Sequence, residues 1–87
     1  MNYTLGIKAS AEREYSKLPS EIQQRLATAI NRLPEEPRPH GYIKLKGREE
    51  YRIRVGEYRV AYVVDDRRQH IGITKVGHRR DFYAERD

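Results

Sequence analysis

The chain has 87 residues, of which 37% are hydrophobic and 36% are charged, so it specifies one small domain with a thin core. It contains no cysteine, which excludes disulfides and thiolate metal sites, and no apolar stretch long enough to span a membrane. The first residues lack the charged-then-apolar order of a signal peptide, so we expect a cytoplasmic protein with no membrane partner.

The positive charge is concentrated in the second half of the chain. Residues 1–37 hold five Lys/Arg and five Asp/Glu, whereas residues 38–87 hold thirteen and eight, which accounts for the whole net charge of +5. This distribution favours a polyanionic partner, either a nucleic acid or an acidic protein segment. The alternative is a solvated basic surface without a partner.

The first third of the chain predicts a strand followed by two helices. Residues 3–7 alternate between apolar and other side chains, which indicates a short strand. Ser10 predicts the N-cap of a first helix that Pro19 ends, and Ser20 with Gln23 predicts a capping box for a second helix. Two short helices joined by a tight turn form an αα-hairpin.

The period then changes from helix to strand. The proline-rich segment PEEPRPHG (34–41) forbids helix, and four strands are predicted after it, at 43–46, on either side of Gly56-Glu57, and at 70–76. We therefore predict an α+β fold for a single domain, 1–87, with two layers in the order β-α-α-β-β-β-β. An antiparallel sheet carries the αα-hairpin on one face. The last ten residues are expected to form a polar tail or one helical turn, leaving the other sheet face uncovered.

The strands around Gly56-Glu57 place arginines against one another. A Gly-X pair between alternating runs is typical of a two-residue turn, which sets Arg54 opposite Arg59 and places Arg52 on the same face. Like charges directly opposite one another destabilise a sheet, so we infer that this patch binds an anion, with phosphate as the natural candidate. By the same reasoning, Arg54→Ala or Arg59→Ala should leave folding intact or slightly improve it.

Three segments, KLKG (44–47), YRIRVGEYRVAY (51–62) and VGHRRDFY (76–83), resemble the RelE/ParE superfamily of toxins from toxin–antitoxin pairs. The resemblance implies a RelE-type fold and the toxin of a type II pair. The RelE branch cleaves mRNA in the ribosomal A site, whereas the ParE branch blocks DNA gyrase without cutting. The tyrosine of the last segment favours the RelE branch, which predicts a ribosome-dependent endoribonuclease, or mRNA interferase.

The resemblance also implies the site residues. Cleavage would proceed by attack of the ribose 2′-OH on the adjacent phosphate, without metal or cofactor, giving a 2′,3′-cyclic phosphate. The catalytic candidates that it places are Arg52, Arg54, Arg59, Arg79 and Tyr83. The neighbouring basic residues expected to bind RNA are Lys44, Lys46, Arg48 and Arg80.

The sequence departs from the RelE pattern in having Arg52 and Arg54 where well-studied members have lysines. Because arginine stays protonated, it is a poor base. The proton acceptor is therefore either His78, whose residue type titrates near neutrality, or the ribosomal surroundings of the substrate. For His78 itself, a solvated tail residue is an equal alternative. Tyr42 is left open between a structural role and RNA contact.

The partners implied are an acidic, partly helical antitoxin that shields the arginines, and the ribosome with its mRNA. One alternative is a ParE-like inhibitor whose partner is gyrase, which the two arginines at lysine positions favour. Another is a homologue that binds RNA or antitoxin without catalysis. The histidines and carboxylates show no metal-ligand spacing, so no metal site is predicted.

Overall fold

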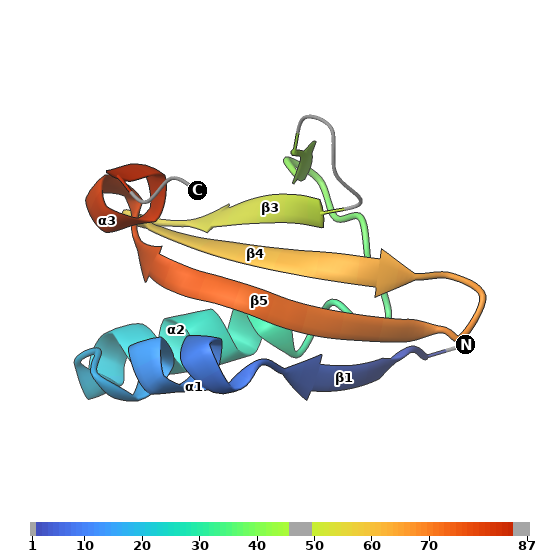
Figure 1. Ribbon diagram of the computed structural model, residues 1–87, viewed down its shortest axis with the longest axis horizontal. Helices are drawn as coiled ribbons and strands as arrows, with labels where there is room; N and C mark the ends of the chain where they lie inside the picture. The colour runs from blue at the N-terminus through green and yellow to red at the C-terminus, as the bar shows by residue number, and fades with distance from the viewer. Residues whose placement is uncertain (1, 46–49, 85–87) are drawn as a thin grey trace.

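The computed structural model describes residues 2–45 and 50–84, without the side chains of residues 83 and 84. Its elements follow the predicted order and end with one further helix (Figure 1). They are β1 (Thr4–Ile7), α1 (Ala9–Ser16), α2 (Ser20–Ile30), β2 (Ile43–Lys44), β3 (Glu50–Val55), β4 (Tyr58–Asp65), β5 (His70–His78) and α3 (Arg79–Ala84). The predicted α+β fold class is confirmed.

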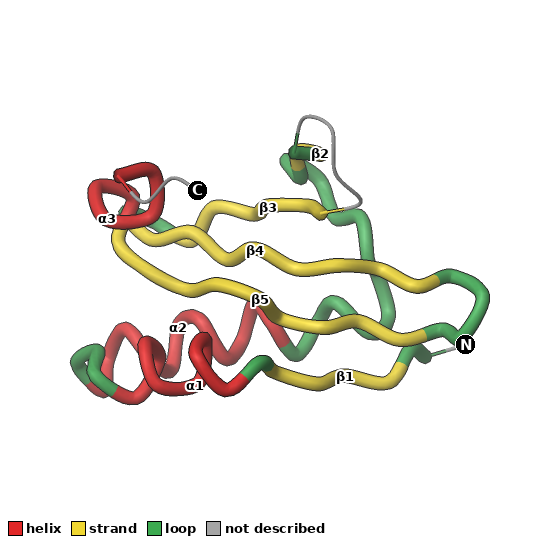
Figure 2. Tube along the Cα trace, in the orientation of Figure 1, coloured by secondary structure: helices red, strands yellow, loops and turns green. Residues whose placement is uncertain are grey.

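The strands form one sheet in the order β1-β5-β4-β3-β2. β2, β3, β4 and β5 pair antiparallel, as predicted. β1 adds to the edge in parallel with β5, from Thr4 opposite His70 to Ile7 opposite Ile73, and Figure 2 shows the two strands side by side. A parallel pair needs a long connection, which the helix pair and the middle strands supply here.

The turn between α1 and α2 is held by a glutamine side chain. Neither predicted serine cap forms, because Ser10 lies inside α1 and Ser20 is the first residue of α2. Gln23 instead donates its amide to the carbonyl oxygens of Leu18 at 2.9 Å and Ser16 at 3.3 Å. These bonds satisfy carbonyls at the end of α1, so the tight turn positions the helix pair.

The core lies between the helix pair and one face of the sheet. Tyr51, Ile53, Val60 and Tyr62 all lie on that face with at most 7% of their surface exposed, so they form the inward face of the hairpin, opposite the arginines. Each buried side chain of this size contributes about 1.5–3 kcal/mol. The remaining members of the core cluster are Ala11, Leu26, Ile30, Leu33, Ile71, Ile73 and Val76.

The proline-rich connector is fixed to the sheet by polar contacts. Tyr62 donates its hydroxyl to the carbonyl of Pro37 at 2.7 Å, and burial raises the pKa of this phenol to about 12. Arg38 binds the Asp66 carboxylate at 2.8 Å and lies 5.1 Å from the centre of the Tyr51 ring. The hydrogen bond from Arg38 holds the pKa of Asp66 below its usual range. The connector is therefore an ordered part of the fold.

The opposite side of the sheet, here called the arginine face, carries Arg52, Arg54 and Arg59. The prediction that nothing covers it is wrong, because α3 packs on β5 and β4 at the end near the β3–β4 turn (Figure 1). Phe82 of α3 is only 7% exposed, and Lys75 donates to its carbonyl oxygen at 3.1 Å.

Within residues 2–45 and 50–84, no helix has the length and apolar character needed to cross a membrane.

Candidate functional site

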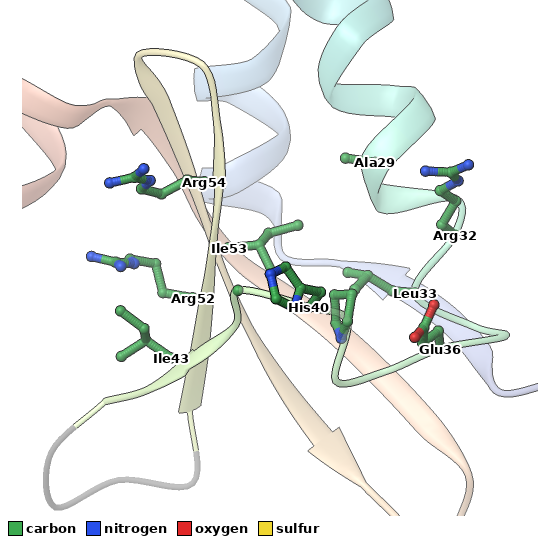
Figure 3. A pocket seen from close by; sticks show the side chains of 11 residues that line it. Ala29, Arg32, Leu33, Glu36, His40, Ile43, Arg52, Ile53 and Arg54 are labelled. Carbon is green, nitrogen blue, oxygen red and sulfur yellow. The ribbon is translucent and has the colours of Figure 1, made fainter.

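The hairpin has the predicted register. Val55 pairs with Tyr58 across Gly56-Glu57, which sets Arg54 opposite Arg59. Gly56 has a φ of 61°, a conformation that favours glycine and is typical of such turns. Figure 3 shows Arg52 and Arg54 extending side by side from β3. Three guanidinium groups therefore start from neighbouring positions on the arginine face.

Arg59 is part of the structure as well as of the patch. Only 6% of its surface is exposed, and its Nη1 donates to the carbonyl oxygens of Gly56 at 3.1 Å and Tyr58 at 3.0 Å. Its Nε is buried with no hydrogen-bond partner among the described residues. The guanidinium therefore braces the turn, whereas the Arg54 side chain is exposed. This burial reverses the expected effect of Arg59→Ala on stability.

Arg79 lies beside the same turn. Its Nε pairs with the Glu57 carboxylate at 2.8 Å, and its backbone N–H donates to the Glu57 carbonyl at 2.8 Å. Both side chains are more than half exposed, so the ion pair contributes at most about 1 kcal/mol. The backbone bond fixes the start of α3 at the hairpin, and Arg79 thereby lies at the edge of the arginine face.

His78 does not join the arginines. It pairs with Tyr58 across β4 and β5, and the two rings lie 5.2 Å apart, so its side chain is on the helix-pair side of the sheet. Its Nδ1 accepts the backbone N–H of Arg80 at 3.1 Å, which caps the first turn of α3. A neutral imidazole has one lone pair for accepting a proton, and this bond uses it. The geometry therefore does not support His78 as the proton acceptor.

The remaining predicted residues are spread around the site. Arg80 is exposed on α3, and Lys44 is exposed on β2 but pairs with Tyr51, which places it on the opposite face from Arg52. The backbone of Tyr83 belongs to α3, whereas its side chain lies outside the described part of the structure. Lys46 and Arg48 also lie outside the described residues.

Tyr42 packs edge-on against Tyr51 at a centroid distance of 5.7 Å and is still 39% exposed. The ring therefore has a structural contact, and its outer edge reaches solvent.

Lys75 is a residue of the arginine face that the sequence analysis missed. It lies opposite Ala61, which lies opposite Arg52, so the three share one row across the sheet. The register between β4 and β5 shifts at this point, and β5 carries one extra residue, Thr74. The signal in the sequence was a broken alternation, because Lys75 falls where strict alternation from Ile73 expects an inward apolar residue.

A cavity of about 550 Å³ lies on the other side of β3, between the end of α2 and the connector (Figure 3). Ile53 faces it, and Arg52 and Arg54 also line it at the edge formed by β3 (Figure 3). The cavity therefore borders the arginine face at Arg52 and Arg54. Among residues 2–45 and 50–84, no group of three His, Cys, Asp or Glu residues is arranged to hold a metal ion.

Fold and site together define a small basic α+β domain with an arginine-rich face on a five-stranded sheet. Residues 5–83 match the family described as the ParE toxin of type II toxin–antitoxin system, parDE. The chain therefore belongs to this toxin family within the RelE/ParE superfamily. No curated protein sequence matches it.

Solved structures of RelE toxins are similar over nearly the whole chain and favour the RelE branch. The archaeal RelE–RelB complex from Pyrococcus horikoshii is 32% identical, with 91% of this chain and 97% of that chain covered and a TM-score of 0.81. A mutant E. coli RelE in the free state is 29% identical, with 98% and 94% covered and a TM-score of 0.79. The RelBE2 toxin–antitoxin complex from Mycobacterium tuberculosis is 27% identical, with 90% and 99% covered and a TM-score of 0.80.

Proposed function

We propose that this toxin is a ribosome-dependent endoribonuclease that cleaves mRNA in the ribosomal A site and so inhibits translation. The observation that carries the proposal is the crowding of Arg52, Arg54 and Arg59 on one sheet face, with Arg54 directly opposite Arg59. Like charges at this spacing repel, and a phosphate between them removes the repulsion. The similarity to RelE toxins supports RNA as the polyanion in this proposal.

The proposed reaction uses the nucleophile already present in RNA. The 2′-OH attacks the neighbouring phosphorus and the 5′-oxygen leaves, so the protein must stabilise negative charge on the phosphorane oxygens. The exposed guanidinium of Arg54 and its neighbour Arg52 hold two phosphate oxygens, since a guanidinium binds in a bidentate manner. Arg79 neutralises charge near the leaving group, after exchanging the Glu57 carboxylate for phosphate. Tyr83 stacks on a base or orients the nucleophile. No cofactor takes part.

Basic residues on both sides of the hairpin would extend the contact with RNA, although Lys44 lies on the opposite sheet face from Arg52. Arg80 on α3 and Lys44 on β2 are exposed and lie on opposite sides of the hairpin. Lys46 and Arg48 contribute to the same role in this proposal. Charge on both flanks would guide the substrate toward the arginines through long-range attraction, which falls with ionic strength.

An acidic antitoxin is the proposed partner that keeps the toxin inactive in the cytoplasm. The similar P. horikoshii and M. tuberculosis structures are complexes of toxin and antitoxin. An acidic, partly helical segment would complement the excess positive charge of residues 38–87 and compete with RNA for the arginine face. Part of its contact would be with the helix pair.

A second candidate function is inhibition of DNA gyrase without catalysis. Two observations favour it: the matching family description is that of ParE toxins, and arginines replace lysines at 52 and 54. Arginine holds phosphate well but transfers protons poorly. A protein built only to bind would lose nothing by that replacement.

Primer extension on a translated mRNA tests the proposal directly. We expect new 5′ ends within codons at the ribosomal A site when purified toxin is added, and none when ribosomes are omitted. Arg54→Ala should reduce cleavage, whereas Arg67→Ala, an exposed arginine in the β4–β5 turn, serves as the matched charge control. Intact transcripts combined with loss of gyrase supercoiling in a parallel assay would instead establish the second candidate.

A further inference from the structure

Lys75 reaches the arginine face because a β-bulge interrupts β5. Strict alternation from Ile73 would turn Lys75 toward the helix pair, but the pairing with β4 skips Thr74. Val76 takes the inward position instead and is 1% exposed in the core. Bulges re-aim side chains in this way and are frequent beside active sites. The bulge thus places a long cationic side chain beside the arginines.

The surroundings of Lys75 leave room for a phosphate. Arg52 and Lys75 lie at the two ends of a row whose centre is Ala61, so roughly 10 Å separates their Cα atoms. Ala61 contributes only a methyl group between these two long side chains. In the next row Gly77 lies opposite Arg59, and a Cβ at Gly77 would meet no atom within 4 Å. A phosphate held by the arginines can therefore also be reached from β5.

Lys75 supplies a property that the arginines lack. A departing 5′-oxygen needs a proton, and a guanidinium does not release one under these conditions. A lysine ammonium is the cation that can do so, because its proton transfers readily. Within the three described strands β3, β4 and β5, Lys75 is the one lysine. His78, the other residue considered for proton transfer, lies on the opposite side of the sheet.

We propose that Lys75 is the general acid of the RNA cleavage, an inference that rests on the proposed nuclease function. The 2′-OH gives its proton to a solvent water while its oxygen bonds to phosphorus. The bond between phosphorus and the 5′-oxygen breaks, and the Nζ ammonium transfers a proton to that oxygen. The products are a 2′,3′-cyclic phosphate and a 5′-hydroxyl, and the neutral amine regains a proton from solvent.

Lys75 has a structural contact that any test must separate from catalysis. Its Nζ donates to the Phe82 carbonyl at 3.1 Å and lies 5.1 Å from the centre of the Phe82 ring. The flexible four-carbon stem lets the same ammonium turn from α3 toward a phosphate. Lys75→Arg keeps the charge and can donate to the same carbonyl, so it preserves the contact with α3 while removing the transferable proton.

The experiment uses a short synthetic mRNA in the A site of purified ribosomes, with the full-length toxin. One version has the natural linkage at the mapped cleavage position, and the other has sulfur in place of the bridging 5′-oxygen. A thiolate leaves without a proton because thiol pKa values lie near 8.5. We measure single-turnover cleavage of both by wild type, Lys75→Arg and Lys75→Met, and hydrogen exchange of the α3 amides in each.

We expect both variants to cut the natural linkage about 10²–10⁴-fold more slowly and the sulfur linkage at nearly the wild-type rate. The ratio of the two rates is independent of the folded fraction, so it is informative even for a destabilised variant. An Arg54→Ala control should slow both linkages alike. If wild type cleaves the RNA and Lys75→Arg shows the same ratio of natural-linkage to sulfur-linkage rates as wild type, the role of Lys75 is overturned while the nuclease proposal stands. No cleavage by wild type overturns the nuclease proposal, and this inference with it.

Discussion

The pair Arg54 and Arg59 should respond in opposite ways to the same substitution. Arg59→Ala removes two hydrogen bonds from a charged donor to the turn carbonyls, each contributing about 1.5–3 kcal/mol. The loss is partly offset, because the buried Nε without a hydrogen-bond partner is removed, which returns about 1–3 kcal/mol. Relief of the like-charge pair returns up to about 1 kcal/mol more. We expect a net destabilisation of about 2 kcal/mol.

For a domain of this size, that loss lowers the Tm by roughly 10 °C. Arg54→Ala removes an exposed side chain from the same cross-strand pair, so its effect should stay within about 0.5 kcal/mol of wild type or be slightly stabilising. Thermal and guanidinium unfolding followed by circular dichroism measure both variants. Equal melting of Arg59→Ala and wild type, or an equal loss in Arg54→Ala, would refute the bracing role of Arg59.

Three further outcomes follow from other contacts. Because burial raises the folded-state pKa of Tyr62 to about 12, stability should be full below pH 10 and fall as pH rises from 10 to 12, a dependence that Tyr62→Phe removes in alkaline unfolding titrations. Because Arg38 lowers the pKa of Asp66, the ionised Asp66 carboxylate stabilises the fold above about pH 4, and this stabilisation is lost on further acidification. Asp66→Asn should therefore show a shallower decline in stability at low pH. Gly56→Ala should destabilise by about 1–2 kcal/mol in denaturant titrations, because φ is 61° and the new Cβ would approach Arg25 Nη2 to 2.7 Å.

The hairpin was predictable because its information is local. Gly56-Glu57 specifies a two-residue turn, and once the turn is fixed the opposition of Arg54 and Arg59 follows without any knowledge of the rest of the fold. The helix pair was also predicted correctly, although the two serine caps that indicated it do not form. Gln23 satisfies carbonyls of the preceding helix, a contact that depends on how two helices meet.

The positions of Lys75, His78 and α3, which were not predicted, all depend on β5. Its own alternation places Lys75 on the wrong face, and only the pairing with β4 shows that Thr74 is an extra residue. The same register decides on which side His78 lies and where α3 starts. Had the strand ended at Val76, as expected, the chain beyond it would have had no fixed direction.

The bulge, the position of Lys75 and the docking of α3 are thus linked features of one strand. Val76 must enter the core because it is apolar, and the extra residue at Thr74 is what lets the strand satisfy that demand. The consequence is that Lys75 faces outward beside Arg52 instead of inward. A Thr74 deletion makes Lys75 follow Ile73 directly, so strict alternation then turns Lys75 outward and Val76 inward without a bulge, and the domain should still fold. Thr74→Ala keeps the bulge and loses only the 2.5 Å bond to Glu50. Unfolding of the deletion variant, with Thr74→Ala still folded by circular dichroism, would contradict this register and would remove the basis for placing Lys75 on the arginine face.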